Sequence, residues 1–206
     1  NNGSFLLQQG AISNFTTSAA TFNEGLRIIS SPSGNYNFFT NTTSAAVSNI
    51  LNLGDSLVIR NSTINSFHLR YFRTNTGTYI YQNLNISSGS FYTDNSIMST
   101  FTSNLINVNN GSIKFENNSS GTFNSRFSCS SDFLIKDSPV NWDVNTSTYS
   151  TCSVGGNFTI SNSQCTFDTY IHSLNINGNF LIETKRVTWI SEYPVTVNGN
   201  YSIDNS

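Results

Sequence analysis

Carboxylates recur at one position of a repeated sequence pattern, and paired carboxylates are what glycoside-cleaving enzymes use. That position holds Arg60, Asp94, Glu116, Lys136, Ser161, Glu183 and Asp204. Glu183 and Asp204 fall one repeat apart, and strands about 5 Å apart would suit the roughly 5–5.5 Å carboxyl separation of a retaining glycosidase. No third acid, clustered histidine or basic clamp accompanies the pair. We therefore expect no enzyme, with a glycoside hydrolase or lyase as the alternative.

The cysteines and histidines give no sign of a metal or cofactor site. There is no Cys-x-x-Cys motif and the two histidines are isolated in sequence, so we expect no metal and no cofactor. Cys165 occupies a column that otherwise holds valine, which is typical of a buried, unreactive thiol. Cys129 and Cys152 fall in consecutive repeats and are candidates for a disulfide, although they align two positions out of register.

Asn-x-Ser/Thr motifs are dense, and they are the main indication of cellular compartment. The candidate glycosylation sites are Asn14, Asn41, Asn85, Asn110, Asn118, Asn145, Asn157 and Asn200. This density, with few lysines, predicts a secreted or cell-surface glycoprotein of a eukaryote. A net charge of −2 offers no surface for nucleic acid, and no apolar run is long enough to span a membrane.

A stretch between Phe67 and Asn83 concentrates arginine and tyrosine. Its candidate binding residues are Arg70, Tyr71, Arg73, Tyr79 and Tyr81. Exposed tyrosine and arginine suit contacts with carbohydrate or protein. The alternative is a β-hairpin that turns at Thr76-Gly77 and packs its aromatic residues on the body of the protein.

A short repeat runs through the whole chain. One column of large apolar residues contains Phe5, Leu26, Leu57, Phe91, Ile113, Phe133, Phe158, Phe180 and Tyr201, separated by 21, 31, 34, 22, 20, 25, 22 and 21 residues. The residue two positions later is apolar in all but one repeat, so both face inward from a strand. Later repeats add a second apolar pair, such as Val140 and Trp142, and a third, such as Leu174 and Ile176. The pattern predicts an all-β solenoid over residues 1–206, with about nine coils of three strands and enlarged coils at about 30–50 and 67–83.

Four residues after the apolar anchor comes a column rich in asparagine, usually followed by serine. It contains Asn61, Asn95, Asn117, Asp137, Asn162 and Asn205. Asparagine tolerates the left-handed conformation of a tight corner, and stacked amides can bond along the stack. We expect this ladder to exclude glycans from Asn61 and Asn117, whereas Asn157 and Asn200 should point outward and carry them.

With its Gly-Asn-Phe-x-Ile and Asn-Ser motifs, the chain resembles the parallel β-helix repeat families, whose coils often carry inward asparagine ladders. The resemblance covers the whole chain, concerns the fold alone, and favours the right-handed form because the coils are longer than 18 residues. Neither end shows a capping element, which predicts end-to-end self-association or a longer parent chain. We expect a rod-like structural segment of a fibril, surface coat or adhesin stalk. The alternative is a β-helix that binds or cleaves polysaccharide.

Overall fold

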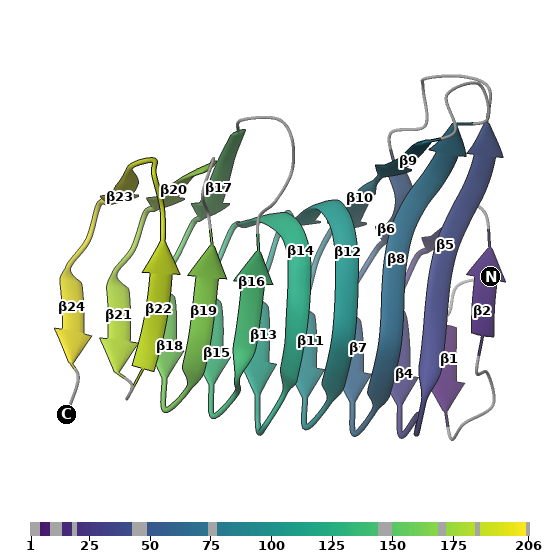
Figure 1. The fold of residues 1–206 in the computed structure, drawn as a ribbon, viewed down its shortest axis with the longest axis horizontal. Coiled ribbons are helices and arrows are strands. Elements are labelled where there is room, and N and C mark those ends of the chain that lie inside the picture. Colours follow the sequence, from purple (N-terminus) through teal and green to yellow (C-terminus); the bar gives the residue numbers. More distant parts are fainter. Residues whose placement is uncertain are drawn as a thin grey trace.

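The computed structural model describes residues 5–8, 14–17, 20–42, 49–73, 78–143, 150–168, 172–183 and 186–204, and the described residues form strands and turns without a helix. Successive turns of the chain stack along one axis, with the two termini at opposite ends (Figure 1). The prediction of an all-β parallel β-solenoid is confirmed. No helix in the described part of the chain is long and apolar enough to span a membrane.

The first sheet contains one short strand from each repeat. Its nine strands are, in spatial order, β1 (Phe5–Gln8), β4 (Leu26–Ile29), β7 (Leu57–Arg60), β11 (Phe91–Asp94), β13 (Ile113–Glu116), β15 (Phe133–Lys136), β18 (Phe158–Ser161), β21 (Phe180–Glu183) and β24 (Tyr201–Asp204). Every neighbouring pair is parallel, and the predicted anchors are direct partners, as in Phe158↔Phe180 and Phe180↔Tyr201. The stack makes about seven turns rather than the expected nine.

The second face begins after the asparagine corner. Its strands are β2 (Asn14–Thr17), β5 (Gly34–Thr42), β8 (Thr63–Arg73), β12 (Ile97–Val108), β14 (Ser120–Cys129), β16 (Val140–Asp143), β19 (Gln164–Asp168) and β22 (Arg186–Ile190). The third face has β3 (Ala20–Phe22), β6 (Asn49–Leu53), β10 (Asn83–Ile86), β17 (Ser150–Val154), β20 (His172–Ile176) and β23 (Val195–Val197). Between β10 and β17 the C-terminal parts of β12 and β14 supply this third face, since both strands continue around the corner.

The enlarged coils are largely sheet rather than irregular loop. In the first, β5 lies parallel to β8 from Asn35↔Ser66 to Thr42↔Arg73. In the second, β8 pairs antiparallel with β9 (Thr78–Tyr81), and residues 74–77 between them lie outside the described residues. Figure 1 shows β5 and β8 projecting beyond the rest of the stack. Alternating aromatic and polar residues favour this extension, because they suit a pleated surface.

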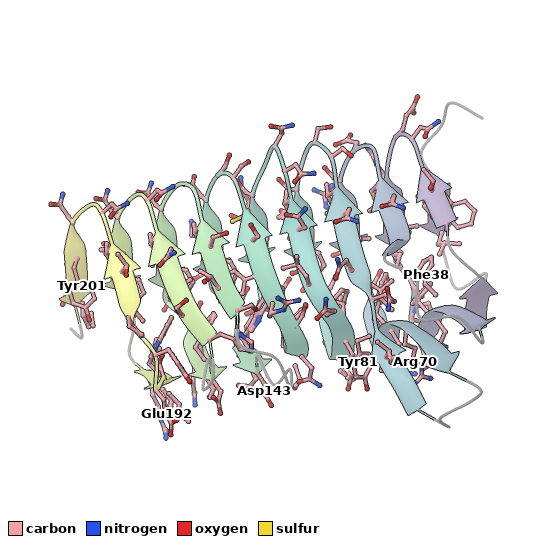
Figure 2. All side chains as sticks on the ribbon, turned by 90° about the horizontal axis from the view of Figure 1, so that it is seen from above. Phe38, Arg70, Tyr81, Asp143, Glu192 and Tyr201 are labelled. Atoms are coloured by element: carbon pink, nitrogen blue, oxygen red, sulfur yellow. The ribbon has the colours of Figure 1, made fainter. Side chains whose placement is uncertain are left out.

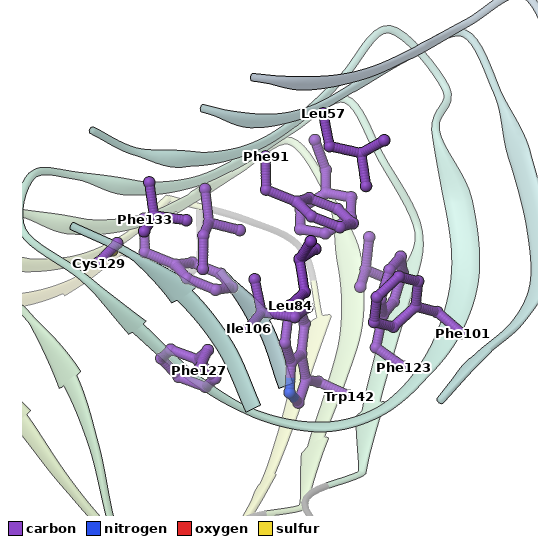
Figure 3. Close-up of a cluster of buried hydrophobic side chains, with 14 of the residues drawn as sticks. Leu57, Leu84, Phe91, Phe101, Ile106, Phe123, Phe127, Cys129, Phe133 and Trp142 are labelled. Atoms are coloured by element: carbon purple, nitrogen blue, oxygen red, sulfur yellow. The ribbon is translucent and has the colours of Figure 1, made fainter. Parts of the chain in front are cut away.

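Two columns of stacked aromatic rings fill the interior. On the first face the rings of Phe133 and Phe158 lie 4.7 Å apart, and the column continues to Phe180 and Tyr201. On the second face the column is Tyr36, Phe67, Phe101, Phe123, Trp142, Phe167 and Trp189, with centroids 5.0–6.2 Å apart. Figure 3 shows part of this core, where the rings of Phe133 from the first column and Trp142 from the second meet edge to face. Burial of these rings is the main source of stability, and their stacking also fixes the register between coils.

Candidate functional site

The asparagine corner is strained in the way that its sequence predicts, but it faces outward. Ser30 and the ladder residues Asn61, Asn95, Asn117, Asp137 and Asn162 all have positive φ, between 44° and 55°. Asn95 Nδ2 donates to Asn61 Oδ1 at 2.9 Å, and Asn162 Nδ2 donates to Asp137 Oδ1 at 2.5 Å. Asn117 donates instead to Asp94 Oδ1, at 2.8 Å. Asn205 lies outside the described residues.

The asparagines of this corner are exposed, so the expectation that the ladder is inward and leaves no room for a glycan is wrong. Strand alternation would point the residue four positions after the anchor into the core. The positive φ of that residue changes the direction of the chain there, so its side chain points outward instead. The following serine takes the inward position. Asn61 and Asn117 are therefore exposed, as are Asn157 and Asn200.

The buried ladder is made of these serines, which sequence reasoning did not identify. Ser31, Ser62, Ser96, Ser119, Ser138 and Ser163 are at most 5% exposed. The backbone N–H of Ser138 donates to Ser163 Oγ at 2.9 Å, while Ser138 Oγ donates to the Lys136 carbonyl at 2.8 Å. Ser62 bonds to Ser96 Oγ in the same way. The signal was present, because serine follows almost every corner asparagine.

A second polar ladder lies at the glycine corner between the third face and the first. The backbone N–H of Asn157 donates to Asp132 Oδ1, that of Asn179 to Asn157 Oδ1, and that of Asn200 to Asn179 Oδ1, all at 2.8–2.9 Å. Glycine precedes this position because coils approach closely there: a Cβ on Gly155 would lie 2.2 Å from the Ser130 carbonyl oxygen. These bonds use the side-chain oxygen, so the Nδ2 of Asn157 stays available for a glycan.

The candidate glycosylation sites differ in exposure. Asn110, Asn118, Asn157 and Asn200 are exposed. Asn85 is half-buried and bonds through its amide to Asn52 and Asn107 on the neighbouring coils. Asn145 lies outside the described residues, as do the side chains of Asn14 and Asn41.

The charged row on the outside of the first sheet contains one ion pair among the described residues. Arg60 Nε lies 3.0 Å from Asp94 Oδ2, and its guanidinium sits 5.5 Å from the Tyr92 ring centroid. Burial, and next the nearby Asp94 carboxylate, raise the pKa of Tyr92. Glu183 and Asp204 are register partners as expected, and both are exposed. Among the described residues no three potential metal-ligating side chains of His, Cys, Asp or Glu gather.

The candidate binding stretch forms the antiparallel pair β8–β9. Arg70 lies opposite Tyr81 in this pair, and Figure 2 shows the two side chains close together. Tyr81 is 43% exposed and Arg70 is half-buried. The side chains of Tyr71, Arg73 and Tyr79 lie outside the described residues. The structure therefore shows the antiparallel strand pair, and of the five candidate residues it describes the side chains of Arg70 and Tyr81 alone.

The three cysteines are free and buried, so the candidate Cys129–Cys152 disulfide is not formed. Cys129 is the register partner of Val154, two residues beyond Cys152. Two residues along a strand and one strand spacing across separate the Cα atoms by about 8 Å, which exceeds disulfide reach. Burial raises the pKa of Cys129 to about 12 and those of Cys152 and Cys165 to about 11, so the thiols are unreactive.

Among the described residues, β24 is the last strand of the first sheet, and no strand covers its outer side. Eight large apolar side chains of the described residues are exposed, and five of them are Ile190, Tyr193, Val195, Tyr201 and Ile203. Tyr201 is 61% exposed although its ring stacks on Phe180 at 5.1 Å, because no ring covers its other side among the described residues. Figure 2 shows Tyr201 at this end. The aromatic column of the core thus runs out onto the surface.

The fold and its ladders define the class of protein as a parallel β-solenoid. Comparison of the chain with protein-family models, curated proteins and solved structures found no match.

Proposed function

We propose that this chain is a rod-like structural segment of an extracellular glycoprotein, in a fibril, surface coat or adhesin stalk, and that a further strand, from a second copy joined end to end or from a longer parent chain, continues the first sheet at β24. The single observation that carries the proposal is the apolar sheet edge at β24. Tyr201 and Ile203 occupy inward positions of β24 but are exposed, and among the described residues no strand pairs with its outer edge. Such an edge is a template for a further strand.

A second copy of the chain offers a matching strand. Each anchor N–H donates to the carbonyl just before the next anchor, as Phe158 does to Asn179 and Phe180 does to Asn200, both at 2.8 Å. The N–H of Tyr201 is the next donor in this series. At the other end, β1 occupies the opposite edge of the same sheet. The sequence Asn-Gly-Ser-Phe-Leu-Leu, whose last three residues begin β1, parallels Asn-Gly-Asn-Tyr-Ser-Ile around the start of β24.

The sides of the rod suit a structural role in an aqueous space. A surface hollow of about 530 Å³ at the corner after the first sheet is open and is lined mainly by asparagine and serine. Glycans on the exposed asparagines would add hydration and resistance to proteolysis. Because side contacts are polar and the end is apolar, association along the axis is favoured over association side by side.

Electron microscopy and sedimentation of the full chain over a range of concentrations test this proposal. The wild type should form rods longer than one chain. Ile203→Lys, which places a charge in the inner column of the joint, should give monomers. Ser202→Lys on the solvent side of the same strand is the matched control and should still assemble. A wild type that stays monomeric at all concentrations, or equal behaviour of the two variants, would contradict end-to-end joining.

A further inference from the structure

A continuous row of uncharged polar residues crosses the outside of the third face. Its members are direct register partners on eight successive strands: Thr21, Asn52, Asn85, Asn107, Ser128, Ser153, Asn175 and Thr196. All are asparagine, serine or threonine. The outside of the first sheet has no comparable row, since arginine, tyrosine, lysine and leucine alternate there.

Hydrogen bonds within the row hold these side chains in place. Asn85 Nδ2 donates to Asn52 Oδ1 at 3.1 Å, Asn107 Nδ2 approaches Asn85 Oδ1 at 3.4 Å, and the hydroxyls of Ser128 and Ser153 are 2.7 Å apart. An amide has two donors and two acceptor sites, so Asn85 keeps one donor and one acceptor site. Asn107 donates to both Asn85 and Asn109, so its side chain offers a ligand its oxygen as an acceptor. The row therefore presents ordered donors and acceptors once per coil, about every 4.8 Å.

Half of this row forms one wall of a groove of about 360 Å³ that runs along the stack. The groove is lined by Asn107, Val108, Asn109, Ser128, Cys129, Ser130, Ser153, Val154, Gly155, Asn175 and Asn177. None of these residues is charged. Val108, Cys129 and Val154 are at most 3% exposed and belong to the core, so the accessible part of the groove is mainly amide, hydroxyl and backbone.

The positively charged side chain beside the groove, that of Arg126, already has hydrogen-bond partners within the protein. Arg126 lies one outward position before Ser128 on β14. Its guanidinium donates to the Asn104 carbonyl and side chain and to Ser150 Oγ, at 2.6–3.1 Å. An anionic ligand in the groove would thus lose its hydration without gaining a free positive partner.

We propose that this groove binds a neutral polysaccharide whose chain lies parallel to the solenoid axis. One sugar ring with its linkage advances by nearly the spacing of one coil, so successive sugars would meet equivalent side chains. Sugar hydroxyls match the amide and hydroxyl groups that line the groove. Because the row is ordered before binding, little side-chain entropy is lost. The inference does not rest on the proposed structural role.

The proposal is tested by isothermal titration calorimetry of the full chain, made without N-linked glycans, against neutral hexasaccharides of glucose, mannose, xylose and N-acetylglucosamine. A hexasaccharide of galacturonic acid is the charged comparison. At least one neutral sugar should bind, with an affinity that is unchanged between low and high salt, and the galacturonate should bind more weakly. Failure of every neutral sugar to bind, or tighter binding of the galacturonate, would overturn the proposal.

A matched pair of variants locates the site. Ser128→Val combined with Ser153→Val removes two hydroxyls from the groove while keeping residues that suit a strand, and it should weaken binding about tenfold or more. The control, Thr122→Val with Thr166→Val, changes hydroxyls on the second face, including one on the same strand β14. Equal weakening by both pairs would overturn the assignment. Amide chemical-shift changes on adding sugar to wild-type protein should map to the third face, and changes elsewhere alone would also overturn it.

Discussion

Truncating Phe158 to alanine should cost far more stability than truncating Tyr201, although both belong to one aromatic column. Phe158 is fully buried and has four ring partners: Phe133 and Phe180 stack on it at 4.7 and 5.4 Å, and Phe167 and Trp189 meet it edge on. A buried Phe→Ala change costs about 3–5 kcal/mol. Because each aromatic pair adds about 0.5–1.5 kcal/mol, we expect the upper end of that range, about 4–5 kcal/mol.

Tyr201 has one stacking partner and is 61% exposed. Scaling the same cost by the covered part of the side chain gives about 1–2 kcal/mol for Tyr201→Ala. Urea unfolding followed by tryptophan fluorescence measures both losses. Trp142 reports on the middle of the stack and Trp189 on its end. The two signals also show whether the end coils unfold before the middle, as a stack of nearest-neighbour contacts allows.

Equal losses for the two variants in dilute solution would refute the view that stability comes from stacking between neighbouring coils. If rods join end to end, the cost of Tyr201→Ala should rise with protein concentration, since a second copy then covers the ring. The stability lost in Phe158→Ala should not change with protein concentration, because Phe158 is already buried within one chain.

Three further predictions concern the cysteines, the asparagine corner and His68. Burial raises the pKa of all three cysteines, to about 12 for Cys129 and about 11 for Cys152 and Cys165. In the folded protein at pH 8 they should therefore resist a thiol reagent, and in denaturant they should react fully. Rapid labelling of the folded protein would contradict this. Asn95→Val at φ 46° should lose about 1–2 kcal/mol in urea unfolding, whereas Asn95→Gly should be nearly neutral, and equal losses would argue against backbone strain. Burial lowers the pKa of His68 below 6.5 in the folded protein. The contribution of His68 to the free energy of unfolding is therefore present above pH 6.5 and is lost as the pH falls through the folded pKa. Thermal melting at successive pH values should show this loss in the wild type, and His68→Gln should remove it.

Much of the first sheet could be predicted from the sequence, because its strand always has the same spacing from anchor to inward partner. The second aromatic column was recognised only in its last repeats, where Trp142, Phe167 and Trp189 follow the anchor by nine residues. In earlier coils Phe101 and Phe123 follow by ten. The additional residue lies in a strand irregularity between Met98 and Phe101 in one coil, and in a second corner residue, Asn118, in the next. A search for a fixed spacing of nine residues therefore misses Phe101 and Phe123.

The corner shows a different limit of sequence reasoning. Its position and left-handed backbone followed from the asparagine column, whereas the direction of its side chains did not. Simple alternation would turn Asn95 inward, and positive φ instead leaves it outside and brings Ser96 in. The row on the third face was also missed, because asparagine and serine are so common in this chain that only strand register distinguishes the row from background.

The hydrogen bonds between coils run along the axis that joins the two termini (Figure 1), and this determines how the molecule would respond to tension. A pull on one end loads the bonds of the outermost coil first, so coils would detach one at a time. Phe158 and Phe180 are register partners 22 residues apart, and that length of chain extends to about 75 Å. Each release would therefore replace a 4.8 Å layer by a much longer tether. A stiff rod of this design would yield stepwise under load and dissipate energy before it broke.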